Sequence, residues 1–189
     1  MSRFEIISTA LPGLHVLQRR PLRDGRGYLE RMFCTTDLAS VLGTRRIEQI
    51  NHTLTAERGV VRGLHFQFPP HAEMKFVSCL RGEVFDVAVD LREDSPTFLQ
   101  WHAETLSADN GRTLSIPEGF AHGFQTLSEQ CELIYFHTAA YVPAADGGVS
   151  PLEPRVGVRW PLPVTSMSER DSRHPPLTAD YRGIRISLQ

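Results

Sequence analysis

Short segments of alternating apolar and polar residues, separated by turn-forming residues, run through the middle of the chain. The clearest is EVFDVAVDL, in which the apolar residues at 85, 87, 89 and 91 share one face, while Val84, Asp86, Ala88 and Asp90 share the other. A period of two is typical of a strand, and Gly82 before it and Pro96 after it are turn signals. Further segments of this kind are WHAETL, RTLSIP and CELIYFH. The pattern predicts an all-β sandwich or barrel.

The segment TTDLASVLG, residues 35–43, has a helical pattern, with a Thr or Asp cap before it and a glycine after its last apolar residue. The chain of 189 residues with 41% apolar content is long enough for one sizeable core, which predicts a single domain. We expect an N-terminal arm over about 1–48, a barrel core over about 49–142, and loops with short helices over about 143–189.

The charge balance gives no basic excess, since 20 Lys and Arg stand against 22 Asp and Glu. The sequence therefore favours neither nucleic-acid binding nor association with a membrane. It shows no signal-peptide pattern, which predicts a cytoplasmic protein. Cys34, Cys79 and Cys131 are an odd number of widely spaced thiols without a CxxC pair, so neither a disulfide framework nor a zinc site is expected. Cys79 and Cys131 are predicted to lie in the core.

Two of the eight histidines lie beside glycines in compact motifs, His65 in RGLHFQ and His122 in IPEGFAHGF. These motifs resemble the two sequence motifs of the cupin superfamily, whose small barrels often carry a metal. A ligand set of His65, His71, Glu73 and His122 is a poor one, because Gln67 replaces the usual second histidine and His71 follows a Pro-Pro turn. We therefore predict no metal. His15, His102 and His174 are interpreted as structural or surface residues.

The chain also resembles the dTDP-4-dehydrorhamnose 3,5-epimerases, which are metal-free members of the cupin superfamily. The resemblance runs from about residue 26 to 175 and rests on the motifs GVVRGLHFQ, EMKFV, DVAVDLREDSPTF, IPEGFAHGF, YFHTAAYVP, VGVRWP and SERD. It implies a cupin-type jelly-roll barrel with a few short helices, a homodimer, and an isomerase that needs no cofactor. The implied substrate is a nucleotide-linked 4-keto-6-deoxyhexose, used in deoxysugar biosynthesis for surface polysaccharides such as lipopolysaccharide.

Inverting a carbon next to a ketone requires a base on one face, a proton donor on the other, and a positive group at the enolate oxygen. By the resemblance, His65 matches the base and Asp171 the carboxylate that orients it. Lys75 matches the lysine that stabilises the enolate oxygen, and Tyr135 the tyrosine that returns a proton from the opposite face.

The binding residues are also implied by the resemblance. Arg26 and Arg62 match positions that hold the diphosphate, for which guanidinium groups are suited. The other matched positions are near the nucleotide for Gln49 and Asn51, near the sugar for His122, and stacked on the base for Tyr141.

Leu29 and Arg31 stand where the family usually has Phe and Glu, which help to hold the thymine nucleotide. The departure is typical of a divergent branch and leaves the nucleotide open, with dTDP expected and CDP or GDP as alternatives. The sequence also leaves open whether C3, C5 or both are inverted. Two other functions stay as alternatives: a metal-dependent cupin oxygenase or isomerase that uses His65, His122 and Glu73, and a non-catalytic nucleotide-sugar-binding cupin.

Overall fold

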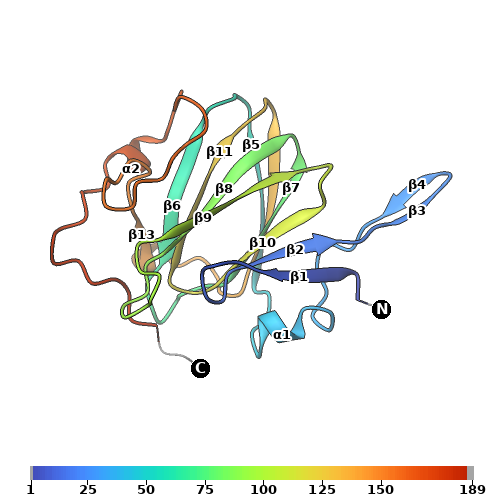
Figure 1. Ribbon diagram of the computed structural model, residues 1–189, viewed down its shortest axis with the longest axis horizontal. Helices are drawn as coiled ribbons and strands as arrows, with labels where there is room; N and C mark the ends of the chain where they lie inside the picture. The colour runs from blue at the N-terminus through green and yellow to red at the C-terminus, as the bar shows by residue number, and fades with distance from the viewer. Residues whose placement is uncertain (1, 187–189) are drawn as a thin grey trace.

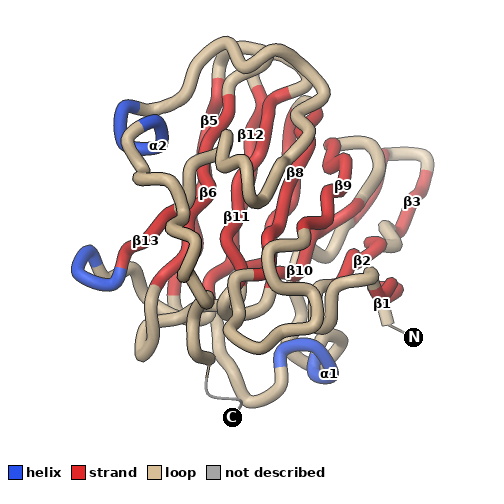
Figure 2. Tube along the Cα trace, turned by 60° about the vertical axis from the view of Figure 1, so that its left-hand side comes forward, coloured by secondary structure: helices blue, strands red, loops and turns tan. Residues whose placement is uncertain are grey.

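Two antiparallel sheets face each other and form a barrel (Figures 1 and 2). The computed structural model describes residues 2–186, so the two ends of the predicted domain, 1 and 187–189, lie outside the described residues. The first sheet has the order β1 (Phe4–Ser8), β2 (His15–Arg19), β10 (Arg112–Ile116), β7 (Lys75–Arg81), β12 (Cys131–His137) and β5 (Gln49–Thr55). The second has the order β13 (Asp146–Gly148), β6 (Val61–Gln67), β11 (Phe120–Thr126), β8 (Glu83–Asp90) and β9 (Trp101–Ser107).

Three short helices accompany the sheets: α1 (Ala39–Leu42), the 3-10 helix η1 (Pro143–Ala145) and α2 (Glu169–Ser172). None of the helices described in residues 2–186 has the length and apolar character needed to cross a membrane. The predicted all-β class with a few short helices is confirmed.

The alternation predicted for β8 is confirmed, and both of its faces are buried. Val84 and Ala88 belong to a core cluster that also takes in Leu114 and Leu133 of the other sheet, so this cluster fills the space between the sheets. The residues at 87, 89 and 91 pack on the outer face of the second sheet, against C-terminal residues that include Val156. Burial on both faces explains why the strand is almost continuously apolar.

The predicted helix over 35–43 is shorter than expected, and the expected cap is wrong. α1 begins after Leu38, which has no side-chain cap, and it ends at Gly43 as predicted. The Asp37 carboxylate is already occupied, since it accepts hydrogen bonds from the backbone N–H of Arg3 at 3.1 Å and from Arg31 at 3.0 Å. Asp37 therefore holds the residue that precedes β1 instead of capping α1.

The hairpin β3 (Leu22–Asp24) and β4 (Gly27–Leu29) projects away from the barrel in Figure 1. Its apolar side chains are exposed, with Tyr28 at 61% and Leu29 at 72%. β1 and β2, which precede it within the expected N-terminal arm, pair within the first sheet. Elsewhere the cysteines are free, and the predicted burial of Cys79 and Cys131 is confirmed.

Candidate active site

A cavity of about 370 Å³ opens between the two sheets. Strands β5, β7 and β12 of the first sheet line one wall, and β6, β11 and α2 line the other. This volume lies in the range that holds small-molecule ligands. The cavity gathers residues predicted for the site from both sheets: Asn51, Arg62, His65, Lys75, His122, Tyr135 and Asp171.

A β-bulge brings Arg62 and His65 to the same cavity. The two residues are three apart, so strict alternation would place them on opposite faces of β6. In the pairing with β11, His65 is opposite His122 and Arg62 is opposite Phe124, so β6 contains one extra residue. Gly63 lies in this bulge with φ of +118°, and an added Cβ would lie 2.5 Å from the Gly123 Cα. Glycine is therefore required for the close approach of β6 to β11.

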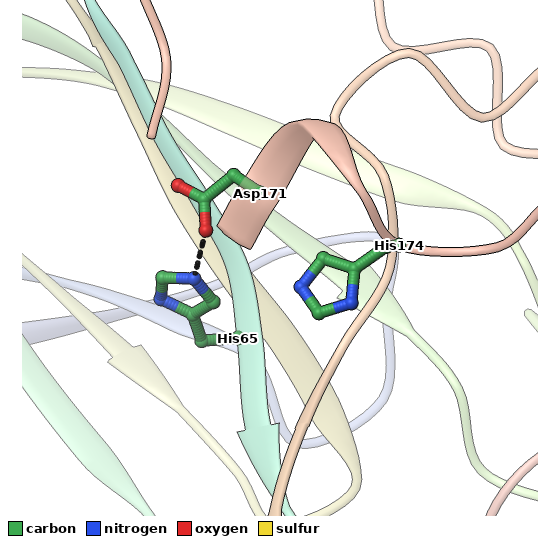
Figure 3. Close-up of side chains that lie close together, drawn as sticks. All are labelled: His65, Asp171 and His174. Carbon is green, nitrogen blue, oxygen red and sulfur yellow. Dashed lines mark hydrogen bonds and ion pairs between the residues drawn. The ribbon is translucent and has the colours of Figure 1, made fainter. Parts of the chain in front are cut away.

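His65 and Asp171 form a hydrogen-bonded pair on one wall (Figure 3). Nε2 of His65 lies 2.7 Å from Oδ1 of Asp171, whose other oxygen accepts a bond from the Gly63 backbone N–H at 3.2 Å. Burial opposes ionisation of Asp171, but the hydrogen bond and charge of His65 and the bond from Gly63 lower its pKa. An ionised carboxylate can only accept, so Nε2 of His65 carries the proton and Nδ1 is left free to accept one.

α2 presents Asp171 to His65 from outside the sheet. Ser168 caps this helix, since its hydroxyl accepts a hydrogen bond from the Asp171 backbone N–H at 3.0 Å. The cap fixes the start of the short helix and so the position of the carboxylate. Both Ser168 and Arg170 also line the cavity.

Lys75 lies on the opposite wall, held by an acidic partner. Its Nζ is 3.0 Å from Oε1 of Glu73 and donates to the His65 carbonyl at 3.3 Å. Burial opposes ionisation of Glu73, but its hydrogen bond with His137 and the charge of Lys75 lower its pKa. The buried carboxylate therefore fixes a cationic side chain at the cavity wall.

Tyr135 lies on β12 beside Lys75 and is 9% exposed. Burial, with the neighbouring charge of Asp86, raises the pKa of its phenol. The ring lies 6.0 Å from those of His122 and His137, measured between centroids. A phenol of raised pKa keeps its proton near neutral pH and is available as a donor.

His122 is buried on the same wall as His65. Its Nε2 lies 3.0 and 2.9 Å from the two oxygens of Asp86. Asp86 is fully buried, and this desolvation raises its pKa. The pair places a polar group on the lining of the cavity.

Of the other predicted binding residues, one lines the cavity and three do not. Asn51 lines it, and Gln49 supports Asn51 through a 3.1 Å hydrogen bond. Tyr141, half-exposed, is joined to Gln49 through its backbone N–H at 2.9 Å. Arg26 is not brought to this cavity: its side chain is 91% exposed on the β3–β4 hairpin and pairs with Asp24 at 2.7 Å.

The sequence interpretation missed several residues at this site. His137 alternates with Tyr135 along β12 and so points to the same cavity, a signal that the period of two contained. Ser168 is the first residue of the SERD motif and has the spacing of a helix cap. His174 was interpreted as structural or surface, but its ring lies 6.5 Å from that of His65 between centroids. It lies in a loop, where no periodic pattern could show this.

The residues considered as metal ligands for an oxygenase are instead paired with other side chains. Glu73 is paired with Lys75 and His137, and His122 with Asp86. His71 is exposed on the turn after Pro70, as predicted. Within residues 2–186, the three metal-ligating side chains that do gather are His65, Asp171 and His174.

Comparisons with known proteins agree with this geometry. The sequence profile of the family described as dTDP-4-dehydrorhamnose 3,5-epimerase matches residues 8–179. The chain belongs to this family. It is 41% identical to the dTDP-4-dehydrorhamnose 3,5-epimerase of Salmonella typhimurium over 90% of this chain and 93% of that protein. As a family member it is a carbohydrate epimerase. The family membership that its motifs implied is confirmed.

Two further members of the family show its range. The crystal structure of an epimerase from Legionella pneumophila in complex with dTDP-4-keto-L-rhamnose matches this chain with a TM-score of 0.89 at 36% identity, over 98% of this chain and 100% of that one. The dTDP-4-dehydrorhamnose 3-epimerase of Streptomyces niveus is 38% identical over 78% of this chain and 72% of that protein. The likeness confirms the cupin-type fold of the epimerase family for this chain.

Proposed function

We propose that this protein inverts C3, C5 or both of a dTDP-linked 4-keto-6-deoxyhexose in deoxysugar biosynthesis. The observation that carries the proposal is the placement of a candidate base and a candidate acid on different sheets that face one cavity. His65 lies on β6 of the second sheet, and Tyr135 on β12 of the first. Inversion needs a proton to leave from one face and return to the other, so this arrangement suits it.

In the proposed mechanism, Nδ1 of His65 removes the proton from the carbon next to the ketone. The imidazolium that forms is stabilised by Asp171, while Lys75 stabilises the negative charge on the enolate oxygen. The Tyr135 hydroxyl then gives its proton to the opposite face of the carbon. Exchange of protons with solvent returns His65 to its neutral form and Tyr135 to the phenol.

The identity of the nucleotide rests on the relatives. The Legionella pneumophila enzyme binds a dTDP-sugar, which supports dTDP for this chain. Arg62 is a guanidinium at the cavity that suits a diphosphate, and its Nε donates to Thr55 at 2.9 Å. Because the family contains both 3,5-epimerases and a 3-epimerase, membership leaves the number of inverted carbons to experiment.

The decisive experiment is an incubation in deuterated water with dTDP- and, in parallel, CDP-4-keto-6-deoxyglucose. We expect deuterium at C3, C5 or both of the dTDP-sugar, with inverted configuration by NMR, and no incorporation with His65→Ala. Deuterium incorporation into the CDP-sugar alone would show that the substrate carries CDP and not dTDP. No incorporation from either would contradict the proposed activity.

We further propose that the protein acts as a homodimer in which the β3–β4 hairpin reaches a second copy. Exposed Tyr28 and Leu29 on this hairpin form an apolar surface near Arg26, whose side chain is 91% exposed and pairs with Asp24 of the same hairpin. A second copy of the chain would bury these residues and receive Arg26 near its own diphosphate site. Sedimentation of a monomer at micromolar concentration would contradict this proposal.

A further inference from the structure

His174 lies beside the His65–Asp171 pair without contributing to the cavity wall. It follows α2 by two residues, and Figure 3 shows its ring turned towards His65. The ligand atoms of His65, Asp171 and His174 all lie within 4.8 Å of one another. Two imidazoles and one carboxylate at such separations are a typical ligand set for a divalent transition metal.

The residues around His174 leave little free space beside its ring. An added Cβ on Gly148 would lie 2.2 Å from Nε2 of His174, so glycine at this position makes the space for the ring. This Nε2 is buried and finds no hydrogen-bond partner among residues 2–186. A buried nitrogen without a partner is costly, and a metal ion is one partner that would satisfy it.

The chemistry of the three side chains also suits a cation. Asp171 supplies a carboxylate whose two oxygens contact His65 and the Gly63 backbone N–H, and His65 and His174 each offer an imidazole nitrogen. The group therefore offers one carboxylate and two imidazoles.

We propose that His65, Asp171 and His174 form an inhibitory zinc-binding site behind the catalytic base. Zn²⁺ would replace the 2.7 Å hydrogen bond between Nε2 of His65 and Asp171, taking one ligand atom from each of the three side chains. Three protein ligands leave at least one coordination position for water.

Zinc at Nε2 of His65 changes which nitrogen can act as the base. The proton leaves Nε2 when the metal binds, and the neutral imidazole then carries a proton on Nδ1. Nδ1 is the nitrogen that the proposed mechanism uses as the acceptor. The metal therefore blocks proton removal without entering the sugar pocket, and this inhibition, unlike the binding, rests on the proposed function.

The site is tested by titrating Zn²⁺ into chelator-treated protein and measuring the heat of binding. The comparison uses wild type, His174→Gln, and the control His52→Gln, which removes an exposed histidine that pairs with Glu132 at 3.1 Å elsewhere on the surface. We expect one equivalent of Zn²⁺ on wild type and on the control. His174→Gln should bind at least about 100-fold more weakly, since even loss of a group that only orients a metal ligand costs up to this factor.

NMR of the histidine side chains supplies a second readout that needs no substrate. Addition of Zn²⁺ should move the His65 ring proton from Nε2 to Nδ1 in wild type but not in His174→Gln. Zn²⁺ should also inhibit epimerisation by wild type and the control, and EDTA should reverse it. Equal zinc affinity in all three proteins, or an unchanged His65 tautomer, would overturn the site. Zinc binding without any epimerase activity in the untreated protein would overturn the proposed function and leave the site standing.

Discussion

In the proposed mechanism the two nitrogens of His65 have different tasks, because Nε2 is bound to Asp171 and Nδ1 is free. Replacing Asp171 by Asn keeps the shape but removes the negative charge and lets the amide favour the wrong tautomer. We expect both solvent exchange and inversion to fall together, on the order of a hundredfold or more. Rates of deuterium uptake and of product formation measure this, and a selective loss of only one of them would contradict the role of Asp171.

Replacing Tyr135 should affect solvent exchange and inversion differently, unlike replacing Asp171, which should lower both. In Tyr135→Phe the base remains, so the enolate still forms and His65 can return the proton to the face from which it came. Exchange with retention should therefore outlast inversion. The measurement is the ratio of exchange to inversion, with wild type as the reference. An unchanged ratio would show that Tyr135 is not the donor and would direct attention to Tyr141 or an ordered water.

In the proposed mechanism Lys75 takes the place that a Lewis acid has in metal-dependent enolisation, because its ammonium is fixed by Glu73 at 3.0 Å. We expect turnover to persist after treatment with EDTA and without added metal. Assays before and after chelation, followed by metal analysis of the protein, check this. Loss of turnover that a divalent ion restores would favour the metal-dependent alternative.

At the scale of elements, the bulge in β6 is what allows Arg62 and His65 to share the cavity. Gly63→Ala should destabilise the fold by about 1–3 kcal/mol, since φ of +118° disfavours alanine and the Cβ would meet Gly123. Urea unfolding measures the change. Gly25→Ala is the matched control, because an added Cβ at Gly25 meets nothing within 4 Å. Equal stability of the two variants would contradict the constraint at Gly63.

The strands were largely predictable from the sequence, because burial of one face imposes a period of two, burial of both faces gives a short apolar run, and turn residues bound each segment. The α1 cap was not, since Asp37 is bound to residues that are 34 and 6 positions away in the sequence. The motifs identified His65 and Asp171 as candidates, but their 2.7 Å contact joins residues 106 positions apart. The motifs also identified Arg62, but its placement in the same cavity as His65 depends on a bulge, and His174 lies in a loop that leaves no regular pattern.

At the scale of the whole molecule, the hairpin predicts complementation between two defective copies. His65→Ala removes the base, and Arg26→Ala removes the cation that we assign to the partner's site. In a mixed dimer, the copy with intact His65 receives an intact Arg26, so one complete site forms. We expect the mixture to recover activity that neither variant has alone. If Arg26 served its own subunit, no complete site would form on mixing, and this outcome would contradict the exchange of hairpins.

The two walls of the cavity belong to different sheets, so the gap across the sugar is set by the packing of side chains between them. Val77, Leu114 and Leu133 on one sheet and Val84 and Ala88 on the other fill this space, and Tyr135 belongs to the same cluster. Since interiors are close-packed, a change of one methylene there moves one wall against the other. We therefore expect the stereochemical outcome of the proposed reaction to depend on core volume, and altered product ratios are to be sought among variants of core residues that do not line the cavity.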